Sequence, residues 1–260
     1  MKKAHALLLA GLLGATPCAQ AAEAAAGGRD VVAFNASVRV EVDAAGKPVK
    51  VEAPADLPES IRAFIEKRVA SWQYAPARQD GVPAAAVTFV RVGACAIPVA
   101  EGYRLGLDFK GNGPAIVNAG PWFMPPPRYP TEMQRRGTEG TFRVAYAIQA
   151  DGTTKMTSIE PMEGTSNRDM KAFRAALTGW IEALRYQPEQ VNGRAVATDM
   201  SFPVSFMLST HEGPRSNAAY REELEARALA SKECLAATSP SGPLPIAQNS
   251  PVKVTPVPAG

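Results

Sequence analysis

The sequence predicts an α+β fold made of two similar units, each with the order strand, hairpin turn, strand, helix, strand. Polar and apolar residues alternate over 37–42 and again over 141–149, the period of a half-buried strand. Apolar residues at helical spacing follow each hairpin. The stretch "WQYAPARQDG" at 72–81 also returns as "LRYQPEQVNG" at 184–193, with Tyr, Pro and Gly at the same offsets. The chain is therefore an internal duplication.

The first unit has a complete set of elements. Its order is a strand at 37–42, a turn at 43–46, a returning strand at 47–52, a helix that opens at Pro58 and ends near Trp72, and a strand at 87–92. Ile61, Ile65 and Val69 give the helix one apolar face.

The second unit repeats this order. It has a strand at 141–149, a turn at 150–152, a returning strand at 153–160, a helix capped by Ser166 or Asn167 that runs to Leu184, and a last strand at 199–208. In each unit one helix must cover one face of a mostly antiparallel three-stranded sheet.

The remaining segments differ in composition from the two units. We expect the first unit at 31–100, a Gly/Pro-rich linker at 101–126 and the second unit at 127–210. A further helix is expected at 216–236, and the Pro-rich tail at 239–260 is expected to be disordered.

The first 21 residues have the pattern of a secretory signal peptide. Two lysines precede a short apolar run, and a small-x-small sequence ends at Ala21. The run is about half of the roughly 20 apolar residues that a membrane span needs. An uncleaved anchor is the alternative. Lipid attachment at Cys18 fits less well, because Pro17 stands where a small residue is expected.

The charge and the cysteine content limit the classes of function that the chain can have. Loss of Lys2 and Lys3 with the leader leaves 26 basic and 25 acidic residues, so no electrostatic case for nucleic acid or an anionic membrane surface remains. Cys95 and Cys234 then form a plausible disulfide of an exported protein. The alternative is two buried thiols, and the spacing excludes a local metal or redox motif.

No motif points to catalysis. His211 is the only histidine after position 21, and no P-loop, Gly-x-Ser-x-Gly or dinucleotide fingerprint is present. Catalysis by paired carboxylates or by a Ser/Lys pair is not tested by this search, because such residues need not be neighbours in sequence. We expect a non-enzyme with no catalytic residues, no metal and no cofactor.

The repeated stretch is predicted to be a structural joint. Its Pro ends the helix, its Tyr packs a ring under the helix with the hydroxyl in water, and its Gly supplies a loose turn into the last strand. The residues concerned are Tyr74, Pro76, Gly81, Tyr186, Pro188 and Gly193.

A combination of short motifs carries a family resemblance. Tyr129-Pro130 precedes Glu139-Gly140-Thr141, Asp151-Gly152 forms the hairpin, "LRYQP" ends the helix at 184–188, and Gly193 precedes "FPVSF" at 202–206. Over about 127–208 the chain resembles the C-terminal domain of the TonB energy-transducer family. The first unit, over about 31–93, is similar to a reduced copy.

The resemblance implies a periplasmic domain that pairs an extended segment of an outer-membrane receptor with its last strand. Pro203 cannot donate to a ladder, so its strand should lie at a sheet edge, and an exposed edge accepts partner strands. Alternatively, the C-terminal helix or the other unit caps this edge. The implied partner-binding residues are Arg128, Tyr129, Pro130, Asp199, Met200, Ser201, Phe202, Pro203, Val204, Ser205 and Phe206.

The expected function is therefore a periplasmic TonB-like protein-binding module associated with TonB-dependent transport. Its partner would be a receptor or another envelope protein, with no nucleic acid and no cofactor. Family transducers keep an uncleaved N-terminal anchor and a long Pro-rich spacer. This chain instead has the pattern of a cleavable signal, and no such spacer is evident in its sequence. An inner-membrane-anchored energy transducer with an uncleaved N-terminus and a structural envelope component are the alternatives.

Overall fold

A computed structural model describes residues 32–99, 102–117, 124, 126–163, 165, 170–208 and 245–257. The expected leader at 1–21, the expected helix at 216–236 and Cys234 lie outside these residues.

The first unit forms around a long central strand. Its elements are β1 (Val32–Val42), β2 (Pro48–Glu52), α1 (Glu59–Ala70), β3 (Gln73–Ala75), β4 (Ala77–Gln79), β5 (Val82–Ala84) and β6 (Ala86–Val99). β1 pairs antiparallel with β2 on one side and with β6 on the other. β6 extends well beyond the predicted 87–92, because its far end pairs with β1 as far as Val32↔Ala96.

The predicted apolar face of α1 packs onto this sheet. Ile65 and Val69 are fully buried, as are Val38 and Val40 of β1. Burial of each such side chain contributes about 1.5–3 kcal/mol.

The second unit repeats the topology. Its elements are α2 (Thr131–Arg135), β9 (Gly140–Ile148), β10 (Thr154–Pro161), α3 (Met170–Ala183), β11 (Tyr186–Gln187), β12 (Gln190–Val191), β13 (Arg194–Ala195) and β14 (Thr198–Phe206). The sheet order β10-β9-β14 matches β2-β1-β6 of the first unit. Phe173, Leu177 and Ile181 of α3 are buried against Phe142 and Tyr146 of β9. Each half is thus an α+β unit of antiparallel strands and one helix, as predicted.

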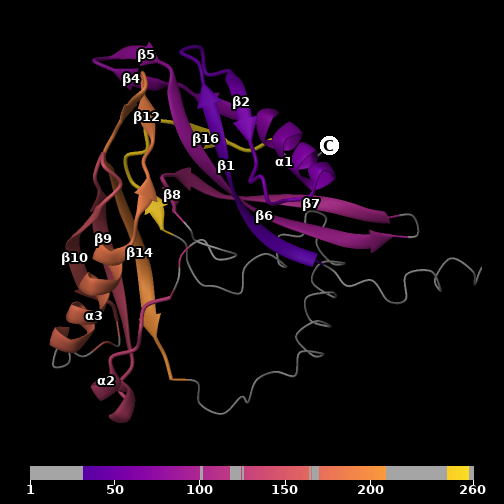
Figure 1. Cartoon of the computed structure of the whole chain (residues 1–260). Helices are drawn as coiled ribbons and strands as arrows, with labels where there is room; N and C mark the ends of the chain where they lie inside the picture. Colours follow the sequence, from indigo (N-terminus) through magenta and orange to yellow (C-terminus); the bar gives the residue numbers. More distant parts are fainter. Residues whose placement is uncertain are drawn as a thin grey trace, which may run out of the picture.

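Both sheets are larger than the predicted three strands. The first sheet has six strands. Beside β2, β1 and β6 it contains β12 of the second unit, which pairs with β6 (Val191↔Ala86), β13, which pairs with β12, and β7 (Gly102–Gly113), which pairs with β6 farther along. The second sheet has four strands. The two units therefore share one sheet and lie against each other (Figure 1).

The predicted linker at 101–126 is wrong over most of its described length. β7 (Gly102–Gly113) returns along β6 from Val99↔Gly102 to Phe89↔Gly113, and β8 (Ala115–Ile116) follows. The glycines of this segment favoured a linker, although Leu105, Leu107 and Phe109 alternate with other residues at the period of a strand. Leu107 is buried, and the Phe109 ring lies edge-on to Trp72 with centroids 5.4 Å apart.

The predicted disordered tail at 239–260 is also wrong over 245–257. β15 (Ile246–Ala247) pairs with β14, and β16 (Lys253–Thr255) pairs with β3. Proline does not prevent this, because short strands at a sheet edge tolerate missing donors.

The two covering segments interlock the units. β7 lies on the first unit, and β8 continues to pair with β11 of the second unit (Ile116↔Tyr186). β15 lies on the second unit, and β16 continues to pair with β3 of the first unit (Val254↔Tyr74). Each repeated Tyr stretch is thus paired with a short strand, β8 or β16, and the strand that precedes it in the chain, β7 or β15, lies on the other unit.

Candidate functional site: the outer edge of β14

β14 presents two different edges. Its inner edge pairs with β9 through all nine residues, from Thr198↔Ile148 to Phe206↔Gly140. Met200, Phe202 and Val204 point into the core and are buried, whereas Asp199 and Ser205 point outward and are exposed. This alternation fixes the register, because a slip by one residue would expose the core side chains.

The outer edge is covered at one end only. β15 pairs with Met200 and Ser201, and the Gln248 backbone N–H donates to the Asp199 carbonyl oxygen at 2.8 Å. No strand among the described residues pairs with this edge from Phe202 to Phe206. Within the described part of the chain, this stretch of the edge is therefore an unpaired row of backbone groups, which is what strand addition requires.

Pro203 faces this open edge. The backbone groups of Asp199 point outward toward the tail, and in a strand every second residue points to the same side. Pro203 is four residues on and so also points outward. Its missing N–H consequently costs the β9 ladder nothing. The sequence-based expectation that Pro203 lies in an edge strand agrees with this position.

The lead-in residues lie at the open end of β14. The Tyr129 ring packs edge-on against Phe206 with centroids 5.3 Å apart, and its hydroxyl donates to the Thr138 carbonyl oxygen at 2.8 Å. Partial burial and the nearby Glu139 carboxylate raise the pKa of this hydroxyl. Tyr129 thus forms a fixed apolar wall beside the edge. Arg128 is exposed and Pro130 caps α2.

The repeated tyrosines are buried, and the expectation that their hydroxyls stay in water is wrong. The Tyr74 hydroxyl donates to the Val69 carbonyl oxygen at 2.8 Å, and the Tyr186 hydroxyl lies 2.6 Å from the Tyr146 hydroxyl. Burial raises the pKa of Tyr74 and of Tyr186 above the ordinary tyrosine value. Each Tyr anchors the end of its helix inside the core.

The repeated prolines and glycines also have defined positions. Pro76 separates β3 from β4, and Pro188 separates β11 from β12. Gly81 and Gly193 form tight two-residue hairpin turns rather than loose ones, because each follows a residue that also has positive φ, Asp80 or Asn192.

A buried polar cluster at the junction of the units was not predicted. Glu189 is fully buried and accepts hydrogen bonds from Thr88 at 2.6 Å and Ser250 at 2.7 Å. Burial raises the pKa of Glu189 and lowers that of Arg91, which is 7% exposed. The signal was a difference between the repeats, "YQPE" against "YAPA", which places Ala77 where the second unit has Glu189.

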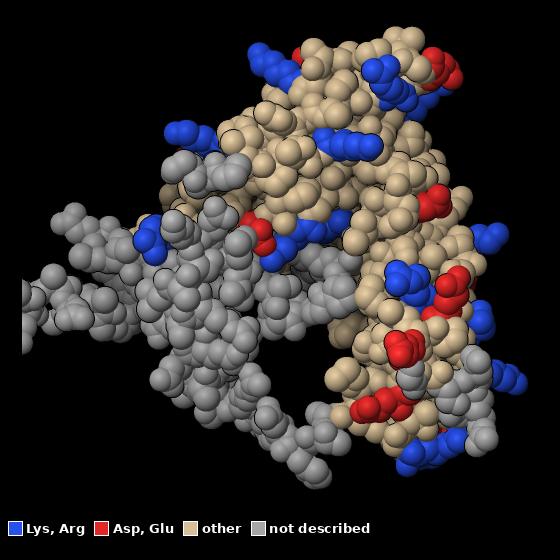
Figure 2. Space-filling model, turned by 180° about the vertical axis from the view of Figure 1, so that it is seen from behind, with Lys and Arg blue, Asp and Glu red and all other residues tan. Residues whose placement is uncertain are grey.

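Other predicted features are described only in part. Cys95 is fully buried in β6 and disulfide-bonded, and its pairing with Cys234 stays a prediction. Within the described part of the chain, no helix is long and apolar enough to cross a membrane, and no group of metal-binding side chains occurs. Basic and acidic side chains are interspersed over the face shown in Figure 2.

The second unit is a small antiparallel α+β domain in which one helix covers one face of the sheet. Residues 125–208 match the family described as Gram-negative bacterial TonB protein C-terminal. Such domains are periplasmic protein-interaction domains. The solution NMR structure of the Pseudomonas aeruginosa TonB CTD is 25% identical, with 38% of this chain and 91% of that chain covered and a TM-score of 0.28. No curated protein matches the chain.

Proposed function

We propose that the chain is a periplasmic protein-binding module that adds an extended segment of an envelope protein, such as an outer-membrane receptor, to the outer edge of β14. The open backbone from Phe202 to Phe206 supports the proposal most directly. The family match of residues 125–208 supports a protein partner. The unit at 31–100 is in this view a degenerate copy of the same domain.

The geometry of the edge specifies what a partner strand would meet. Pro203 offers a carbonyl acceptor and no donor, whereas Ser205 offers both groups. On the helix side, the Trp180 ring lies 6.0 Å from the Phe202 ring, and Tyr129 flanks Phe206. An extended segment with apolar side chains at alternate positions therefore fits, with main-chain bonds giving affinity and the aromatic wall giving selectivity.

Photo-cross-linking in cells tests this function. A photoreactive residue at Ser205 is expected to trap a partner, because this position lies on the open edge. The matched control is Glu160 of β10, an exposed residue on the opposite edge strand of the same sheet. A product at Ser205 that is absent at Glu160 supports strand addition. Absence of any partner at Ser205 would leave a structural envelope component as the better interpretation.

N-terminal sequencing of the exported protein tests its location. A start at Ala22 is expected if residues 1–21 are a cleaved signal. A retained Met1 would contradict the cleaved form and favour an energy transducer anchored in the inner membrane.

A further inference from the structure

The two units differ in how completely the last strand is covered. In the first unit β7 covers β6 from Val99 to Phe89. In the second unit, among the described residues, β15 covers Met200 and Ser201 of β14, and the two residues after it bond to Asp199. The first unit thus shows the edge filled by the chain itself, and the second shows it partly filled.

β15 is held on β14 by a ladder of two residue pairs, and Asn249, an exposed residue just beyond it, adds two side-chain bonds. The Asn249 side chain accepts a bond from the Asp199 backbone N–H at 2.7 Å and donates to the Asp199 carboxylate at 3.0 Å. Asn249 thereby extends β15 with a side-chain amide in place of a backbone group. Ile246 is 64% exposed, whereas Ala247 packs against the core of the second unit. The carbonyl oxygen of the buried Pro245, just before β15, accepts a bond from Arg91 at 2.9 Å.

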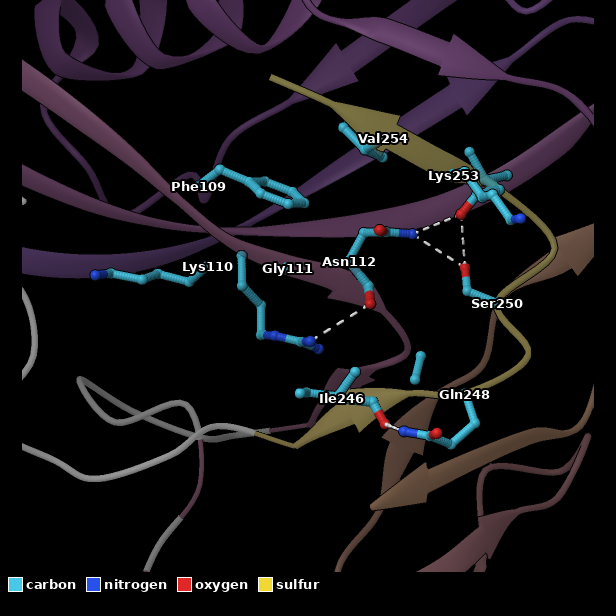
Figure 3. A pocket seen from close by; sticks show the side chains of 12 residues that line it. Phe109, Lys110, Gly111, Asn112, Ile246, Gln248, Ser250, Lys253 and Val254 are labelled. Atoms are coloured by element: carbon cyan, nitrogen blue, oxygen red, sulfur yellow. Dashed lines mark hydrogen bonds between the residues drawn. The ribbon is translucent and has the colours of Figure 1, made fainter. Parts of the chain in front are cut away.

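The tail beyond β15 is anchored firmly. The Asn112 amide of β7 donates to the Val252 carbonyl oxygen at 2.8 Å and to the Ser250 hydroxyl at 3.0 Å (Figure 3). Val252 is 1% exposed. These contacts surround a pocket of about 330 Å³ between β7 and the tail. Release of β15 therefore need not release the rest of the tail.

We propose that β15 is an intrachain competitor for the partner-binding edge of β14. The anchor at Val252 keeps β15 at a high effective concentration beside Asp199. A partner strand that extends past Phe202 must displace β15, so the tail limits the length and affinity of the strand that binds. This inference rests on the proposed function and adds its regulation.

Cross-linking at two positions of β14 tests the competition. A photoreactive residue at Ser201 reports on the covered part of the edge, and one at Ser205 reports on the open part. In the unsubstituted chain, Ser201 is expected to trap the tail within the same chain. Asn249→Ala removes both side-chain bonds to Asp199 and is expected to raise partner trapping at Ser201 by about tenfold.

Two further variants sharpen the test. Gln248→Pro combined with Asn249→Ala also removes the backbone donor to Asp199, and is expected to raise trapping at Ser201 further. Gln248→Ala is the matched control, because this side chain bonds only to the Ile246 carbonyl oxygen within the tail. It is expected to leave trapping unchanged, and unaltered thermal unfolding checks that each variant is folded.

The outcomes separate the two proposals. If Ser205 traps a partner but trapping at Ser201 is the same in every variant, β15 is no competitor and the proposed function stands. If neither position traps a partner in any variant, strand addition itself fails and the competition fails with it.

Discussion

Replacement of Gly152 by alanine should destabilise the second unit strongly, because this glycine touches the backbone of the repeated stretch. A Cβ atom added at Gly152 would lie 2.1 Å from the Tyr186 carbonyl oxygen. The Gly152 carbonyl oxygen also accepts a bond from the Tyr186 backbone N–H at 2.9 Å. The hairpin turn and the helix exit are thus packed backbone against backbone.

The magnitude has two parts. Gly152 has a φ of +80°, and an alanine in this left-handed region costs about 1–2 kcal/mol. The carbonyl oxygen must also move away from the new methyl group, which breaks the bond between Tyr186 and Gly152 and costs about 1–3 kcal/mol more. We therefore expect Gly152→Ala to lower the free energy of unfolding by about 2–5 kcal/mol.

Gly193 provides the matched control. Its φ is +75°, and an added Cβ would meet no atom within 4 Å. Gly193→Ala should therefore lose only the conformational part, about 1–2 kcal/mol. Urea denaturation of both variants measures the difference. Equal losses at the two positions would refute the reasoning, because only Gly152 has the close contact.

The same contact exists in the first unit. A Cβ at Gly46 would lie 2.4 Å from the Tyr74 carbonyl oxygen, whereas Gly81 has open space. The hairpin glycine of each unit is therefore tied to its repeated tyrosine. This contact explains why the turn and the Tyr stretch recur together in the duplication.

Two more predictions concern the buried polar groups. Tyr186→Phe should cost about 1–3 kcal/mol because the buried Tyr146 hydroxyl loses its partner. The double variant with Tyr146→Phe should lose less stability than the two single variants lose together. Additive losses in chemical denaturation would contradict this pairing. Glu189 has a raised pKa when folded, so its favourable contribution is present at low pH and declines as pH rises through that pKa. Glu189→Gln should therefore gain stability relative to the unsubstituted chain as the pH rises above the ordinary glutamate pKa of about 4, and a pH-independent difference would refute this assignment.

Local patterns were sufficient for the framework of each unit. Alternation marked the central strands β1 and β9, and helical spacing marked α1 and α3, because each element buries one face against a core within its own unit. Pro203 was interpretable because a missing donor restricts a residue to an edge wherever the strand lies. The contact of Tyr129 with Phe206 agrees with the resemblance, which placed both residues at one site.

The elements that depend on the other unit were not predictable in this way. β7 and the tail strands contain the glycines and prolines that locally indicate turns and linkers. Glu189 and Arg91 are polar residues that local patterns assign to the surface, yet they are buried where the units meet. Their partners include Ser250 for Glu189 and Pro245 for Arg91, and both partners lie in the tail, far away in sequence.

The sequence by itself determined the α+β order of each unit and the family resemblance of the second unit, and it predicted a duplication, since these follow from local periodicity and short motifs. Only the tertiary structure decided which edges are open. Strand pairing joins backbone groups that carry little side-chain information, so β15 on β14 and β7 on β6 had no distinct signature. The extent of the candidate binding edge, from Phe202 to Phe206, is therefore a property of the folded chain.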